Sequence, residues 1–353
     1  MSGNSSAAAP GTPKPRWKRL LQNLALSVGV FAACVAALEI TLRIAGYGNL
    51  EIYQPDAKLY WRLKPNQDCF TKVDHKPVHV NSHGTRGPEF SENKPANTIR
   101  ILSLGDSRTF GWGLADGETY SRRLEQLLGE SGKGNAALRT PQRVEVINAG
   151  VNAWSYSQML VFYRDFAAQW KPDLVIFGEA NLWTQFSEKN SPEFARKFMN
   201  RVRLKNFLRR FALYHFVVEV KLREFYTRYR TRFIPVDPQR DALFKDQQQS
   251  DPDAVFRSAI EGLCQTARSN GAKATLIFLP TLDELQSTNW STVLTNKLAV
   301  SAKLGVPLVD LTPDLKAGGK ALYLEGDPVH LNAAGNALVA QRLFETMTNQ
   351  LRP

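Results

Sequence analysis

A serine, an aspartate and a histidine, far apart in this 353-residue chain, are the residues best suited to chemistry. Ser107 closes the tripeptide Gly105-Asp-Ser107, and Asp327 precedes His330 by three residues. In a tight loop, that spacing lets a carboxylate reach an imidazole, fix its tautomer and stabilise the imidazolium that forms when the ring takes a proton. A serine hydroxyl beside such a ring can attack an acyl carbonyl. The three residues therefore predict acyl transfer through an acyl-enzyme.

The pattern around Ser107 predicts a strand, a tight turn and a helix. Apolar residues at 101, 102 and 104 lead into Gly105, and helical spacing of apolar residues follows at 119–128. Ligands bind beyond the carboxyl ends of strands in open α/β sheets, which favours a site at this turn. The alternative is that Asp106 and Ser107 only cap the helix.

Strands and helices alternate through the rest of the chain. This order predicts an α/β, flavodoxin-like three-layer sandwich with a mainly parallel five-stranded sheet. The further strands are expected at 143–150, 173–178, 274–279 and 306–310, and the further helices at 156–170, 254–269 and 332–351.

The N-terminal region predicts a membrane anchor. Residues 1–15 are rich in Ser, Ala, Gly and Pro and are expected to be disordered. A basic cluster then precedes the apolar run at 20–38, which is long enough to cross a bilayer. Because the positive charges come first, we expect a single-pass inner-membrane helix at 16–44, a cytoplasmic N-terminus and an extracytoplasmic domain. A cleaved signal peptide and a helix buried in a soluble core are the alternatives.

Three further regions flank or interrupt the α/β pattern. Residues 45–97 predict a small β-rich lead-in, and residues 98–353 the main domain. His75, His79 and His83 lie in the lead-in; they lack a helical i,i+4 pair and clustered carboxylates, which favours loop or strand histidines over a metal site. A basic, aromatic-rich helical insertion is expected at 187–238, either as a lid or as a surface for phospholipid headgroups or an anionic polysaccharide.

Composition narrows the class of partner. The net charge of +12 favours anionic surfaces or polymers. Nucleic acid is not expected, because no recognised binding module accompanies the charge. Cys34, Cys69 and Cys264 lack the spacing of a zinc site or a redox pair, and a disulfide between Cys69 and Cys264 stays open. Oligomeric state is not determined by these features.

The order of these motifs resembles the SGNH (GDSL-type) hydrolases, over roughly 101–351. The strand-borne Gly-Asp-Ser and the late Asp327-Pro-Val-His330 carry the resemblance, with Asn148-Ala-Gly150 and Asn181 as weaker signals. The resemblance implies that Ser107 is the nucleophile, His330 the general base and Asp327 the residue that orients it. It also implies an oxyanion hole made by the N–H groups of Ser107 and Gly150 and the amide of Asn181, with no metal or cofactor.

Two features depart from the family pattern. The third block usually runs Gly-x-Asn-Asp, whereas here Gly178 and Asn181 are one residue further apart. Arg108 adds a positive charge next to the nucleophile. It either binds an anionic group of the substrate or pairs with Glu179.

Together these features predict a membrane-anchored serine esterase or O-acyltransferase. The expected substrate is an ester, in particular an O-acetyl group of a cell-envelope or secreted polysaccharide. An anionic glycan is one candidate for this polysaccharide. Hydrolysis and transfer share one acyl-enzyme, so the sequence does not separate them. The alternatives are a lipase or thioesterase and a catalytically silent assembly subunit that keeps the fold.

Overall fold

The computed structural model describes residues 16–50, 53–71, 75–134, 143–180, 192–222, 225, 252–286 and 292–350. The predicted disordered tail at 1–15 and the predicted oxyanion residue Asn181 lie outside these ranges, as does part of the predicted insertion at 187–238.

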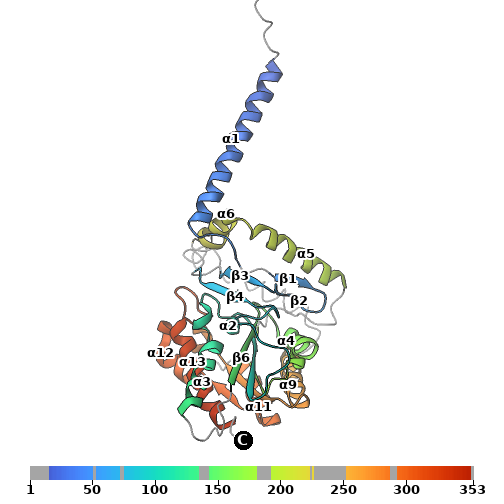
Figure 1. Cartoon of the computed structure of the whole chain (residues 1–353), viewed down its shortest axis with the longest axis vertical. Coiled ribbons are helices and arrows are strands. Elements are labelled where there is room, and N and C mark those ends of the chain that lie inside the picture. Colours follow the sequence, from blue (N-terminus) through green and yellow to red (C-terminus); the bar gives the residue numbers. More distant parts are fainter. Residues whose placement is uncertain are drawn as a thin grey trace, which may run out of the picture.

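A single long helix, α1 (Arg16–Ile44), projects from the rest of the molecule (Figure 1). Residues 17–44 are long and apolar enough to cross a bilayer, and none of the most apolar stretch is buried against the protein. The expected alternative of a helix buried in a soluble core is therefore wrong. A membrane span and a signal sequence both fit such a helix.

The lead-in forms two small antiparallel sheets between α1 and the main domain (Figure 1). One joins β1 (Tyr53–Asp56) to β2 (Tyr60–Leu63), and the other joins β3 (Gln67–Phe70) to β4 (Pro77–Val80). The lead-in continues onto the edge of the main sheet, because Arg86 bridges Asn148 and its N–H donates to the Asn148 carbonyl at 3.0 Å.

The main domain contains the predicted five-stranded sheet, and all of its strands are parallel. The order is β6-β5-β7-β8-β9, so the first strand lies between the second and the third, as in flavodoxin-like folds. Residues from Ile101 to Gly105 are buried, as expected for a strand covered on both faces. The predicted fold class is confirmed. The strands are β5 (Thr98–Gly105), β6 (Arg143–Gly150), β7 (Leu174–Phe177), β8 (Lys273–Phe278) and β9 (Leu308–Asp310).

Two apolar cores lie on opposite faces of the sheet. One packs α3 (Tyr120–Gly134) and α13 (Ala333–Gln350) on the sheet through residues such as Leu124 and Leu343. The other packs α4 (Tyr156–Phe162), α9 (Pro252–Ser269) and α11 (Thr292–Leu304) and includes side chains of the lead-in. Cys69 and Cys264 belong to this second core and are not disulfide-bonded, so the pairing left open by the sequence does not form.

The short helical elements complete the chain. The helix expected at 156–170 continues past α4 as a π-helical turn, η2 (Tyr163–Ala167), and a 3-10 turn, η3 (Ala168–Trp170). Within the predicted insertion lie α5 (Pro192–Leu208), α6 (Ala212–Tyr214) and a π-helical segment, η4 (His215–Leu222). The remaining short elements are α2 (Ser107–Phe110), η1 (Asp116–Glu118), α10 (Leu282–Gln286), α12 (Thr312–Gly318) and η5 (Gly319–Leu322).

Candidate active site

Ser107 is the first residue of α2, directly after β5. Asp106 caps this one-turn helix, because its side chain accepts a hydrogen bond from the Arg108 N–H at 2.9 Å. The helix ends at Gly111, whose φ of 85° is in the left-handed region that glycine favours. The cap predicted as the alternative function of Asp106 therefore exists, and it orients the same turn that carries the serine hydroxyl.

Glycines at the ends of three neighbouring strands make room for this turn. A Cβ on Gly105 would lie 1.8 Å from Thr109 Oγ1, and one on Gly178 would lie 2.4 Å from the same atom. A Cβ on Gly150 would lie 2.2 Å from the backbone nitrogen of Phe110. Because these distances are far shorter than any carbon contact, α2 can pack this deeply between the strand ends only where all three residues are glycine.

The structure brings Ser107, His330 and Asp327 into one chain of hydrogen bonds. Ser107 Oγ lies 2.7 Å from His330 Nε2, and His330 Nδ1 lies 2.8 Å from Asp327 Oδ2. An ionised carboxylate can only accept, so Nδ1 carries the ring proton and Nε2 accepts from the serine hydroxyl. The side chains of His330 and Asp327 are 15% and 11% exposed, which leaves the imidazole reachable while limiting the solvent around it.

Asp327 also shapes the loop that holds the histidine. Its Oδ1 accepts from the backbone N–H groups of Val329 and His330 at 2.9 and 3.2 Å. Burial raises the pKa of Asp327, but the hydrogen bond and charge of His330, together with these N–H groups, outweigh burial and lower the pKa below its usual value. The carboxylate is therefore held ionised next to the imidazole.

Trp112 is a residue of the site that the sequence did not reveal. Its ring stacks on the His330 imidazole, with centroids 5.5 Å apart and planes 21° apart. An aromatic face attracts a cation, so this position favours the imidazolium that proton uptake would create. The available signal was a tryptophan between two glycines, Gly111 and Gly113, immediately after the turn of Ser107.

Arg86 from the lead-in fixes the loop that carries Trp112. Its side chain is almost fully buried, and Nη1 donates to the carbonyls of Phe110 and Gly111 at 2.8 Å each. Nη2 donates to the carbonyl of Leu114, and Nε pairs with Asp116 at 2.7 Å. The guanidinium thus bonds to both sides of Trp112. The lead-in reaches the active site through this arginine.

The three predicted oxyanion donors have different surroundings. The N–H of Ser107 is at the start of α2, and within the described residues it donates to no hydrogen-bond acceptor. The N–H of Gly150 already donates to Asn148 Oδ1 at 3.0 Å, and the residue packs against α2. Close packing explains why glycine is needed at this position, and the role of its N–H as an oxyanion donor stays a prediction. Asn181 lies outside the described residues.

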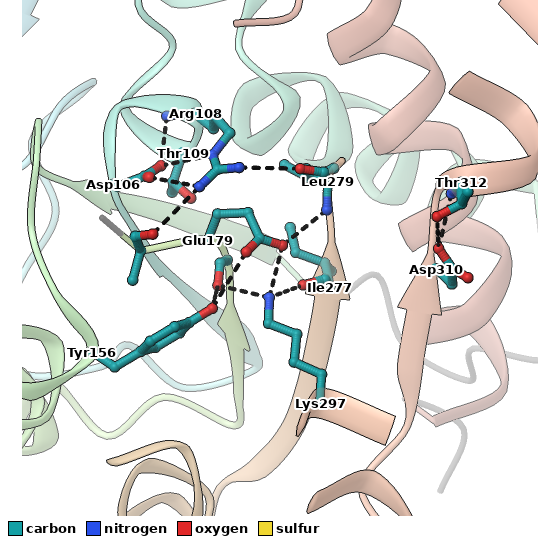
Figure 2. A network of polar contacts seen from close by, with 12 residues as sticks. Asp106, Arg108, Thr109, Tyr156, Glu179, Ile277, Leu279, Lys297, Asp310 and Thr312 are labelled. Carbon is teal, nitrogen blue, oxygen red and sulfur yellow. Dashed lines mark hydrogen bonds and ion pairs between the residues drawn. The ribbon is translucent and has the colours of Figure 1, made fainter. Parts of the chain in front are cut away.

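Arg108 pairs with Asp106, not with Glu179 as one alternative predicted. Its Nη2 lies 2.9 Å from Asp106 Oδ2, and its Nη1 donates to the carbonyl of Leu279 at 3.1 Å (Figure 2). Burial raises the pKa of Asp106, but the charge and hydrogen bonds of Arg108 outweigh burial and lower it. The side chain of Arg108 is only 12% exposed, and it links the turn of Ser107 to Leu279.

Glu179 instead forms a buried ion pair with Lys297. Lys297 Nζ lies 2.7 Å from Glu179 Oε1, and the same oxygen accepts from the N–H of Leu279 at 2.9 Å (Figure 2). Lys297 is fully buried and Glu179 is 2% exposed. Burial lowers the pKa of Lys297 although Glu179 opposes the shift. The sequence reasoning missed this lysine; its signal was a charge on the apolar side of a helix, three residues from Leu294 and from Val300.

The three lead-in histidines lie apart in separate contacts. His75 stacks on Phe70, His79 Nδ1 is 2.6 Å from Asp68, and His83 Nε2 is 2.9 Å from the carbonyl of Phe90. Among the described residues, no cluster of three or more potential metal ligands is found.

Comparison with known proteins gives likenesses in fold alone. No family model and no curated protein sequence matches the chain. The crystal structure of TesA is 15% identical with a TM-score of 0.44, over 71% of this chain and 99% of that chain. The psychrotrophic esterase EstA from Pseudoalteromonas sp. is 14% identical with a TM-score of 0.42, over 72% and 99%. A two-domain esterase, CEX, active on acetylated mannans, is 14% identical with a TM-score of 0.44, over 71% and 49%.

The main domain presents Ser107 directly after β5, next to the strand β7 where the order of the parallel sheet reverses, which is where ligands bind in such sheets. The chain therefore has the flavodoxin-like α/β fold that the sequence resemblance implies.

Proposed function

We propose that this protein is a membrane-anchored serine esterase or O-acyltransferase, with Ser107 as nucleophile, His330 as general base and Asp327 as the residue that orients the ring. The observation that carries the proposal is the continuous chain from Ser107 Oγ through both nitrogens of His330 to Asp327, with distances of 2.7 and 2.8 Å. These are hydrogen-bond distances suited to proton transfer.

The chemistry follows from the direction of these bonds. The Ser107 hydroxyl gives its proton to His330 Nε2 as Oγ bonds to the acyl carbon, and the carbonyl electrons move onto oxygen. His330 then returns the proton to the leaving alcohol as the ester bond breaks, which leaves an acyl-enzyme. Water or a sugar hydroxyl attacks this intermediate in a second cycle. Asp327 and Trp112 stabilise the imidazolium in both halves.

The N–H of Ser107 is the first proposed oxyanion donor, because it lies at the start of α2 next to the attacking oxygen. On the strength of the sequence resemblance, we propose the N–H of Gly150 and the side-chain amide of Asn181 as the other two donors. Donors aimed at the developing charge typically contribute about 3–4 kcal/mol each to the barrier reduction.

The proposed substrate is an O-acetyl ester of a cell-envelope or secreted polysaccharide, and the proposed location is the outer face of the inner membrane. The reason is α1: a helix with its basic residues at the start and apolar residues after them keeps the N-terminus in the cytoplasm. The main domain would then face the compartment in which envelope polymers are modified. The net charge of +12 suits an anionic polymer.

A fluorophosphonate probe tests the nucleophile. We expect the full-length protein in detergent to form one phosphonyl-serine bond at Ser107 with loss of HF, and His330→Ala to abolish labelling. Ser269→Ala, which removes an exposed serine at the end of α9, is the control and should label normally. A folded wild-type protein that stays unlabelled would support the silent-subunit alternative.

Product analysis then distinguishes the substrate classes. Release of acetate from acetylated polysaccharide, without fatty-acid release from phospholipid or thioester, supports the proposal. The reverse result supports the lipase or thioesterase alternative. Acetyl groups that move to an added glycan instead of to water identify a transferase.

A further inference from the structure

The helices α5 and η4 carry an apolar surface that no described part of the chain covers. Leu204, Phe207 and Phe211 are 60%, 54% and 41% exposed. Leu204 and Phe207 are three residues apart in α5, and the ring of Phe211, just after the helix, contacts the ring of Phe207 with centroids 5.4 Å apart. Val217, Val218 and Leu222 continue the exposed apolar residues along η4. We call these six side chains the apolar stripe.

Basic residues alternate along the sequence with those of the apolar stripe. The exposed charged residues of α5, α6 and η4 are almost all positive, and the only exposed carboxylate in the described part of these helices, Glu193, lies 3.2 Å from Lys197. Exposed apolar residues flanked by Lys and Arg are the pattern of a helix that lies in a bilayer interface. The exposed basic residues are Arg196, Lys197, Arg201, Arg203, Lys205, Arg210 and Lys221.

The end of α1 is attached to these helices by defined hydrogen bonds. Glu39 accepts from the backbone N–H groups of Ala212 and Leu213 at 2.9 Å each, so a carboxylate of α1 caps α6. Arg43 Nη2 donates to the carbonyl of Arg210 at 2.6 Å. The helix that leaves the domain is thus bonded to the segment between α5 and η4.

This attachment fixes where a bilayer would meet the domain. Figure 1 shows α5 and α6 beside the base of α1, while α11 lies at the opposite end of the molecule. The apolar run of α1 ends at Leu38, one residue before the Glu39 cap. The bilayer surface would therefore lie at the level of α6, next to the apolar stripe.

From this continuity we propose that the apolar stripe docks into the surface of an anionic phospholipid bilayer beside α1 and fixes the orientation of the enzyme domain. The proposal rests on α1 being a bilayer span. A glycan would not require exposed leucine, valine and phenylalanine side chains, whereas the headgroup boundary accepts both these and the flanking charges.

A fluorophore at the stripe tests the docking. In the full-length Cys34→Ala protein, in which Cys69 and Cys264 are buried, Phe207→Cys carries an NBD label. The matched control is Leu298→Cys on α11, which replaces an apolar residue that is 46% exposed at the far end. In vesicles of phosphatidylcholine and phosphatidylglycerol, we expect a blue-shifted emission at position 207 that doxyl lipids quench, and water-like emission at position 298.

Flotation of the same vesicles tests the membrane anchor and the docking of the apolar stripe separately. Protein that floats but has the same emission at both positions overturns the docking while leaving the anchor intact. Protein that fails to float overturns the anchor and the docking together. A shift at position 207 that persists in detergent and grows with protein density identifies a second copy of the chain as the occupant and overturns the lipid assignment.

Charge variants give a second readout. Replacing Arg201, Arg203 and Arg210 by glutamine should weaken the blue shift in anionic vesicles, while Lys316→Gln in α12 together with Lys320→Gln in η5 should leave it unchanged. Equal effects of the two sets would overturn the role of these basic residues.

Discussion

Replacing Lys297 by methionine should strongly destabilise the domain, because Glu179 would keep a buried charge without its partner. Breaking a buried ion pair in this way costs about 3–5 kcal/mol. Each 1.36 kcal/mol is a factor of ten, so the ratio of folded to unfolded protein should fall by about 10²- to 10⁴-fold. The midpoint of thermal unfolding should fall on the order of 10 °C.

The same helix offers a matched control. Lys303 is six residues further along α11, is 62% exposed and pairs with Glu261 at 2.9 Å. Exposed ion pairs contribute about 0–1 kcal/mol, so Lys303→Met should change stability little. Adding Glu179→Gln to Lys297→Met removes both charges while an amide oxygen still accepts from Leu279. This double variant should regain most of the lost stability.

Urea unfolding of the full-length protein in detergent, followed by tryptophan fluorescence, measures these differences, and the fluorophosphonate labelling rate reports the site. Fluorophosphonate labelling of Lys297→Met should also be slower under folding conditions. The reason is that Glu179, which Lys297 fixes, lies two residues before Asn181. If Lys297→Met is as stable as Lys303→Met, the ion pair does not organise this end of the sheet and the reasoning is refuted.

Other changes probe the remaining contacts. Asp327→Asn should keep the fold but lower kcat by about 10⁴-fold, the loss expected when the imidazole tautomer is no longer fixed, and steady-state ester hydrolysis would reveal a smaller role if kcat changes little. Arg86→Met should free the loop of Trp112 and slow fluorophosphonate labelling by up to about 10²-fold, and Arg86→Lys should not restore it, because an ammonium cannot span the three carbonyls. Gly150→Ala should prevent folding, judged by soluble yield. Gly129→Ala is the control: a Cβ at this position of α3 has no atom within 4 Å, so the variant should be more stable by about 0.5–1 kcal/mol. If the chain tolerates both substitutions, the packing argument is refuted. Burial lowers the pKa of His215 from 6.5 to about 4, so the unfolded chain takes up the proton at a higher pH than the folded chain, and stability should fall as the pH drops from 6.5 to 4. His215→Asn should flatten this part of a plot of unfolding midpoint against pH. An unchanged slope would show that His215 does not cause the pH dependence.

The fold was predictable because its strands are short apolar runs between helical patterns. Buried runs such as 101–105 and 174–177 signal strands by composition alone, and their alternation with helices leaves few topologies. The turn of Ser107 was visible for the same reason, since Gly105 directly follows such a run. These signals involve only residues that are neighbours along the chain, so a single sequence is enough to detect them.

The supporting contacts were not predictable because they depend on which distant segments meet. Lys297 and Glu179 are 118 positions apart, and a lone lysine in a helix carries no sign of its partner. The partner of Arg108 was left open between a substrate anion and Glu179 for a related reason: only the geometry of the turn brings its guanidinium to Asp106. The motif indicated Gly150 but not its packing: a Cβ there would lie 2.2 Å from the backbone nitrogen of Phe110, a contact that no local pattern signals.

Because Glu39 of α1 caps α6, the part of the chain that folds together with the main domain begins before Ile44. A secreted version that begins after Ile44, where the helix itself stops, would discard the carboxylate on which α6 depends and would also lose Leu42, which is 7% exposed. Starting instead at Leu38 would retain the last turns of the helix as a short stub. Protein engineers who need a detergent-free form should therefore treat residues 39–44 as the first element of the folded unit and cut the chain before them.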